Sequence, residues 1–107
     1  MTHLSEGDDG RTVQLAIGAE LELGLPENPG TGFRWHIKSD APAPGHSPIA
    51  GLIVDRFTPG GQPGQAGQHV WQWRGLRAGH ADLILELSRA WQSKPGRTFT
   101  LHLTVAG

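Results

Sequence analysis

Apolar side chains alternate with polar ones along most of the chain, which is typical of strands that bury one face. Around Trp35, for example, Phe33 and Ile37 keep the same spacing while Arg34 and His36 stand between them. The same alternation runs through Val13–Ile17, Leu21–Leu25, Trp71–Trp73, Ala81–Leu87 and Phe99–Val105. With one more strand expected at Leu52–Phe57, the pattern predicts about seven strands and no helix.

Glycine and proline separate these sets, as expected where strands turn. The expected turns are at Gly18, Asn28–Gly30, Pro42–Gly45, Pro59–Gly61, Gly79 and Pro95–Gly96. About seven short strands in 107 residues predict an all-β sandwich of two sheets, folded as a single domain over residues 1–107. The connection from Thr58 to Gly67 is long and lacks large apolar side chains, and such loops in compact domains are usually functional or mobile.

Composition and charge exclude several kinds of function. Cysteine is absent, so the chain has neither disulfides nor a catalytic thiol. Nine basic and ten acidic residues give a net charge of −1, and no predicted strand gathers the basic residues, so we expect no nucleic-acid binding. No Gly-x-Ser-x-Gly element is present, and we expect no enzymatic activity.

The histidines show no close metal-ligand spacing, so we expect neither a metal ion nor another cofactor. We expect them on strand surfaces or in loops: His3, His36, His46, His69, His80 and His102.

The chain contains no uninterrupted apolar stretch of transmembrane length, so we expect no membrane partner. Met1 to Gly10 includes three acidic residues and no apolar run, so no signal peptide is visible. The sequence therefore fits either a cytoplasmic protein or an exported one after trimming.

Three short segments carry a more specific signal. The first runs from Leu25 to Trp35 and contains Asn-Pro-Gly-Thr-Gly-Phe at 28–33. The second is Gly-Gln-Ala-Gly at 64–67, and the third is Arg-Ala-Trp at 89–91. In this order and spacing they resemble the motifs Asn-Pro-Thr-Thr-Gly-Phe, Gly-x-Gly-Gly and Arg-Pro-Trp of the chagasin family of cysteine-protease inhibitors. The likeness runs from about Val13 to Val105. Gly30 in place of threonine, Ala90 in place of proline and the imperfect glycine motif depart from the family pattern.

The resemblance implies an immunoglobulin-like sandwich that presents three loops from one end. It implies reversible, non-covalent inhibition of papain-like cysteine proteases by occlusion of the active-site cleft, and we expect the chain to act as a monomer. The protease-binding residues implied are Asn28, Pro29, Gly30, Thr31, Gly32, Phe33, Gly64, Gln65, Ala66, Gly67, Arg89 and Trp91.

The residue types of the first segment suit a narrow catalytic cleft. Gly30 and Gly32 keep the loop slim, and Pro29 restricts its backbone. Asn28 can form an Asx turn that holds the loop away from a productive acyl-transfer geometry. Thr31, at the tip, offers a hydroxyl but nothing electrophilic, so no covalent bond with the catalytic thiolate is expected.

The aromatic residues divide into core and surface candidates. Phe33 and Trp35 are expected to return to the core and anchor the loop, and Trp71 and Trp73 share a buried strand face. Trp91 follows the last alternating strand position, so it either contacts a partner or folds back over the end of the sandwich.

Each segment also has a simpler interpretation. The first segment alone is an ordinary Asn-Pro-Gly turn. The glycine segment either lies extended and pairs its backbone with an enzyme, or forms a hairpin loop without function; a phosphate-binding role lacks the lysine that would follow it. An alternative function is an immunoglobulin-like binding module, for example for carbohydrate, with Trp91 as a stacking platform.

Overall fold

A computed structural model describes residues 1–39, 48–62, 64–91 and 96–107. The turns predicted at 42–45 and at Pro95, together with His46 and Pro63, lie outside the described residues. The elements, in chain order, are β1 (Thr2–Leu4), the short 3-10 helix η1 (Glu6–Asp8), β2 (Thr12–Ala16), β3 (Glu20–Glu27), the 3-10 turn η2 (Pro29–Thr31), β4 (Arg34–Ser39), β5 (Ala50–Thr58), β6 (Gly67–Gly75), β7 (Gly79–Ser88) and β8 (Arg97–Ala106). The described part of the chain contains no helix long and apolar enough to cross a membrane.

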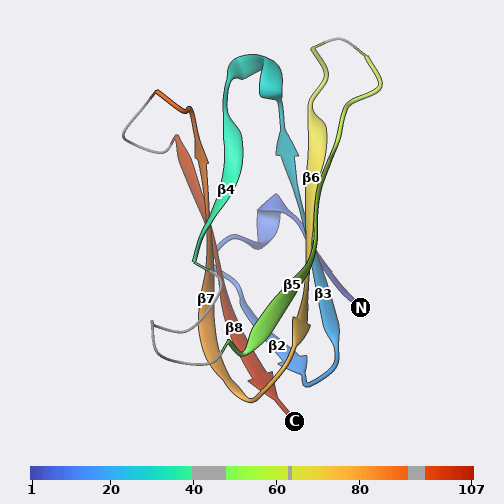
Figure 1. The fold of residues 1–107 in the computed structure, drawn as a ribbon, viewed down its shortest axis with the longest axis vertical. Helices are drawn as coiled ribbons and strands as arrows, with labels where there is room; N and C mark the ends of the chain where they lie inside the picture. The colour runs from blue at the N-terminus through green and yellow to red at the C-terminus, as the bar shows by residue number, and fades with distance from the viewer. Residues whose placement is uncertain (40–47, 63, 92–95) are drawn as a thin grey trace.

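The strands form two four-stranded sheets that face each other (Figure 1). One sheet has the order β1-β3-β6-β5 and the other has the order β2-β8-β7-β4. The short strands β1 and β2 pair in parallel with β3 and β8, while all other neighbours are antiparallel. The all-β sandwich predicted from alternation is confirmed, with β1 as a strand that the alternation did not predict.

The inward positions of the two sheets form one apolar core. On β3 and β6 the ladder places Leu21 opposite Trp73 and Leu23 opposite Trp71, and all four side chains are buried. Trp35 joins them from β4, so the core placement of these three tryptophans is confirmed. The remaining buried apolar residues are Leu4, Val13, Leu15, Leu25, Ile49, Ala50, Ala81, Leu83, Leu85, Phe99, Leu101, Leu103 and Val105.

The predicted limits of β2 and β5 differ from the structure in an informative way. β2 ends at Ala16, and Ile17 lies in the following turn with its side chain exposed. β5 is longer than the predicted Leu52–Phe57 and is an edge strand, which leaves Leu52 and Ile53 exposed. Alternation could not assign a buried face to β5 because its apolar residues are consecutive.

The connections of β3–β4, β5–β6 and β7–β8 lie at the same end of the sandwich, at the top of Figure 1, and the C-terminus lies at the opposite end. The β5–β6 connection is a hairpin within the first sheet, and the β7–β8 connection is a hairpin within the second. The β3–β4 connection instead crosses from one sheet to the other, because β3 and β4 belong to different sheets. The fold therefore brings the three segments singled out in the sequence to one end.

Candidate functional site

We call the described residues of the three connections, 28–33, 59–62, 64–66, 89–91 and 96, the rim. The rim contains every residue that the family resemblance implied for protease binding except Gly67. Gly67 is buried as the first residue of β6 and lies opposite Glu27 of β3. A Cβ atom there would lie against the carbonyl oxygen of Thr58, so close packing within the sheet requires glycine at this position.

The β3–β4 loop is held in shape by its own hydrogen bonds. Asn28 caps η2, and its side-chain oxygen accepts the Gly30 amide at 3.1 Å, which is the Asx turn expected from the sequence. The Thr31 hydroxyl donates to the Asn28 carbonyl at 2.8 Å and accepts the Phe33 amide at 3.3 Å. Thr31 is exposed as expected, but its hydroxyl serves the loop itself. The tip therefore offers a partner mainly its backbone surface and the Thr31 methyl group.

The β5–β6 loop forms a compact turn. The Gln65 amide donates to the Gln62 carbonyl at 3.1 Å, and Gly64 has a φ of 78°, which favours glycine. Gly60 lies against the carbonyl oxygens of Gln65 and Ala66. Gln62 and Gln65 are thus joined by a backbone hydrogen bond, and pairing of the glycine segment with an enzyme stays a prediction.

Contacts between the loops fix their relative positions. The Asn28 side-chain amide donates to the Gly64 carbonyl at 3.4 Å, which joins the β3–β4 and β5–β6 loops. Gly32 has a φ of 84° and lies against the outer edge of the Trp91 ring, where a Cβ atom would be 2.8 Å from Cη2. The β3–β4 loop therefore contacts both of its neighbours.

Arg89 organises the third connection. Its guanidinium carbon lies 4.2 Å above the centre of the Phe33 ring and 5.7 Å from that of Trp91, within the range of cation–π contacts. Phe33 is only half-buried and also lies against Gly96. It therefore belongs to the rim, and the expectation that it returns to the core was wrong. Its ring is held by Arg89 at the surface, which alternation alone could not reveal.

Trp91 is 71% exposed, so it does not fold back to cap the core. Its ring leans on Gly32 at one edge. An exposed tryptophan of this kind is typical of a binding surface.

A pocket of about 330 Å³ lies where the loops meet. Its walls come from all three connections and the strands beneath them: Pro26, Glu27, Asn28, Thr31, Phe33, Ala66, Leu87 and Arg89. The rim is thus hollowed at its centre.

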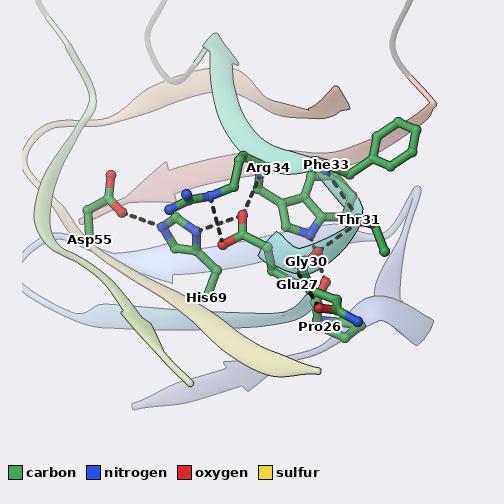
Figure 2. A network of polar contacts seen from close by, with 10 residues as sticks. Pro26, Glu27, Gly30, Thr31, Phe33, Arg34, Asp55 and His69 are labelled. Carbon is green, nitrogen blue, oxygen red and sulfur yellow. Dashed lines mark hydrogen bonds and ion pairs between the residues drawn. The ribbon is translucent and has the colours of Figure 1, made fainter. Parts of the chain in front are cut away.

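A network of polar contacts at the base of the β3–β4 loop was not predicted (Figure 2). Glu27 is buried, and its Oε1 accepts the Trp35 amide at 2.6 Å and lies 3.3 Å from His69 Nδ1. The other ring nitrogen of His69 is within hydrogen-bond distance of Asp55, and Arg34 Nε lies 3.7 Å from Glu27 Oε2.

The sequence contains a signal for this network. Glu27 continues the inward set Leu21, Leu23 and Leu25, and His69 continues the set of Trp71 and Trp73. A carboxylate and an imidazole at inward positions need partners. The placement of His69 at the surface was therefore wrong: its side chain is 13% exposed and stacks on Trp71 at 4.0 Å.

Two carboxyl groups away from the rim have altered acidity. Hydrogen bonds from Gln72 and His3 hold the pKa of Glu22 below its ordinary value. The Ser5 backbone amide and the Arg11 side chain do the same for the pKa of Asp8. Within the described chain, no group of three or more histidine, aspartate or glutamate side chains is arranged to hold a metal ion.

Comparisons with known proteins bear on the family to which this chain belongs. The chain matches the chagasin family of peptidase inhibitors, I42, over residues 14–105. It is 30% identical to amoebiasin-1 of Entamoeba histolytica over 103 residues, which cover 95% of this chain and 97% of that protein. The crystal structure of the cysteine protease inhibitor EhICP2 from Entamoeba histolytica superimposes with a TM-score of 0.82 at 23% identity, covering 98% of this chain and 95% of the other.

A third similarity is to PbICP-C, whose structure was determined in complex with falcipain-2. The two structures superimpose with a TM-score of 0.74 at 18% identity, and the match covers 99% of this chain and 100% of the other. The family match over residues 14–105 and the full-length likeness to amoebiasin-1 lead to one conclusion: this chain belongs to the chagasin family of peptidase inhibitors.

Proposed function

We propose that this chain inhibits papain-like cysteine proteases reversibly and without a covalent bond, by placing the rim in the active-site cleft. The observation that supports this best is the mutual fixing of the three loops at one end of the sandwich. Asn28 joins the first loop to the second, and Gly32 joins it to Trp91. A surface ordered in advance loses little conformational entropy on docking, which favours tight binding.

The β3–β4 loop has the chemistry of a blocking element. A papain-like enzyme attacks with a thiolate paired to an imidazolium. Thr31 presents no electrophile to that thiolate, and Pro29 and the Asx turn hold the loop backbone in a 3-10 turn instead of an extended substrate conformation. The loop therefore fills the catalytic centre without being cleaved.

The β5–β6 and β7–β8 loops contact the enzyme on either side of the cleft. Trp91 supplies a large exposed apolar surface next to the Arg89 guanidinium, and these are the residue types that dominate interface energies. The second loop contributes the exposed residues Gly64, Gln65 and Ala66. A standard interface of about 800 Å² on each partner is compatible with nanomolar affinity when such anchors are present.

The names of related proteins support the same class of target. EhICP2 is described as a cysteine protease inhibitor, and PbICP-C was solved in complex with falcipain-2. Carbohydrate binding is less well supported, because among the described residues Trp91 is the one exposed tryptophan or phenylalanine. Sugar-binding surfaces usually offer several such rings.

Titration of papain with the purified chain tests the proposal. Hydrolysis of a fluorogenic peptide should fall to near zero in a concentration-dependent way, and activity should return on dilution. Trypsin, which has a serine nucleophile, is the control and should keep its activity. Full papain activity at micromolar concentrations of the chain would contradict the proposal.

A further inference from the structure

The β3–β4 loop begins at a buried carboxylate. Glu27 is the last residue of β3, and its side chain is fully buried in the described structure. Its Oε1 accepts the backbone amide of Trp35, the second residue of β4, at 2.6 Å. Because β3 and β4 lie in different sheets, no ladder of backbone hydrogen bonds joins them at this point. The Glu27 carboxylate therefore closes the base of the loop.

One other hydrogen bond closes the same base. The Trp35 indole nitrogen donates to the Pro26 carbonyl at 3.0 Å. Both contacts run between 26–27 and Trp35, on the two sides of the loop. The spacing of the loop ends, and with it the position of the tip, depends on where Glu27 is held.

His69 holds Glu27 in place. Its Nδ1 lies 3.3 Å from Glu27 Oε1, and its Nε2 faces the Asp55 carboxylate (Figure 2). Its ring stacks on Trp71 at 4.0 Å. A neutral imidazole carries a hydrogen on one nitrogen only, whereas an ionised carboxylate can only accept. With both carboxylates ionised, His69 makes both contacts only as an imidazolium.

Charged groups from three strands surround His69. The charged groups that face His69 are Glu27 from β3, Asp55 from β5 and, beyond Glu27, Arg34 from β4. With an imidazolium the two acidic and two basic groups balance, whereas a neutral imidazole leaves one negative charge in excess. Arg34 is a weaker partner for Glu27, since its Nε lies 3.7 Å away and Glu27 Oε2 accepts no hydrogen bond in the described structure.

We propose that His69 is a positioning residue for inhibition: as an imidazolium between Glu27 and Asp55, it holds the base of the β3–β4 loop in the arrangement that docks. The proposal rests on the protease inhibition proposed above. Loss of the proton leaves the buried Glu27 carboxylate without its hydrogen-bonded cation. The loop ends then sample other arrangements, and only the competent fraction binds. Inhibition should therefore weaken as the pH rises.

Two measurements test this proposal, and the first needs no enzyme. In nuclear magnetic resonance spectra of the free chain, the ring signals of His69 and the amide signals of the loop are followed together over a pH titration. As the pH rises, the amide signals of Gly30 and Gly32 should shift with the same midpoint as the His69 ring. Loop amides that do not follow the His69 ring would overturn the positioning role whatever the chain does to proteases.

The second measurement is the inhibition constant against papain from about pH 5 to about pH 8, divided at each pH by that of His69→Gln measured with the same enzyme. The ratio cancels the enzyme's own pH dependence. At the acidic end of the range, the native chain should have an inhibition constant about tenfold lower than that of His69→Gln, which corresponds to the loss of one charge-assisted hydrogen bond. This difference should become smaller as the pH rises.

A second variant and a control complete the experiment. Asp55→Asn keeps the half-exposed position but removes one acceptor of the imidazolium, and it should reduce the pH dependence. His102→Gln removes an exposed histidine paired with Asp82 at 2.8 Å on the other sheet, and its profile should match that of the native chain. A native profile in His69→Gln would overturn the proposal, whereas absence of papain inhibition by the native chain would overturn the proposed function and leave the resonance test to decide the role of His69.

Discussion

The contact between Gly32 and Trp91 makes Gly32→Ala a sharp test of the rim. Gly32 has a φ of 84°, and an added Cβ atom would lie 2.8 Å from Trp91 Cη2. Carbon atoms in ordinary contact are about 3.5–4.0 Å apart, so the ring must retreat by roughly 1 Å. The substitution therefore changes both the loop backbone and the position of Trp91.

The stability cost comes mainly from the backbone. A side chain in the left-handed region costs about 1–2 kcal/mol. The displaced atom is the far end of a tryptophan ring that is 71% exposed, so moving it adds little to the free energy of unfolding. Binding should suffer more, because anchors of this type each contribute about 2 kcal/mol or more and depend on position. We expect inhibition to weaken by at least about tenfold.

Gly18→Ala is the matched control. Gly18 has a φ of 85°, has no atom within 4 Å of the added Cβ, and lies in the β2–β3 turn at the opposite end of the sandwich (Figure 1). Urea unfolding should show similar losses for the two variants, while inhibition constants against papain should change only for Gly32→Ala. Equal inhibition by the Gly32→Ala variant and the native chain would refute the assignment of this contact to the binding surface. Equal weakening in both variants would refute it too, since a general loss of stability would then explain the effect.

Further predictions concern the tip of the β3–β4 loop, the tryptophans and the loss of stability at low pH. Thr31→Arg should weaken papain inhibition by at least about tenfold, because a long cation cannot sit beside a catalytic imidazolium; unchanged inhibition constants would place the tip elsewhere. Trp91→Ala should weaken inhibition with little change in unfolding, whereas truncation of the fully buried Trp73 should cost about 3–5 kcal/mol in urea unfolding; a large stability loss in Trp91→Ala would contradict its exposure. Because the hydrogen bond from Gln72 lowers the pKa of Glu22, this carboxylate stabilises the fold above its unfolded pKa and ceases to do so as the pH falls through its folded pKa. Gln72→Leu should therefore lose less stability on acidification than the native chain in urea titrations at several pH values.

Alternation predicted the fold because the core is built from period-two sets. Leu21 and Leu23 meet Trp73 and Trp71 across the β3–β6 ladder, and a strand with one buried face records this pattern in its sequence. β1 escaped prediction because its three residues are too few to show a period. Its place is set by pairing with β3, a contact between distant parts of the chain.

The candidate site could be predicted from the sequence only in part. The residues of the three segments came from the family resemblance, and the fold gathers them, but their contacts depend on tertiary structure. The stacking of Arg89 on Phe33 joins residues 56 positions apart, so no local pattern records it. Glu27 and His69 do stand at inward positions of their strands, yet each alone also fits the end of a strand. Only the register of β3 and β6 brings them together.

Protection of the catalytic thiol tests the central claim most directly. Papain saturated with the chain is treated with iodoacetamide, and the rate at which its catalytic cysteine is alkylated is compared with that of free papain. Occlusion by the rim predicts a strongly reduced rate in the complex, with full activity recovered when the unalkylated enzyme is released by dilution. Alkylation at the rate of the free enzyme while the chain remains bound would show that the catalytic centre stays open, and would contradict inhibition by occlusion of the cleft.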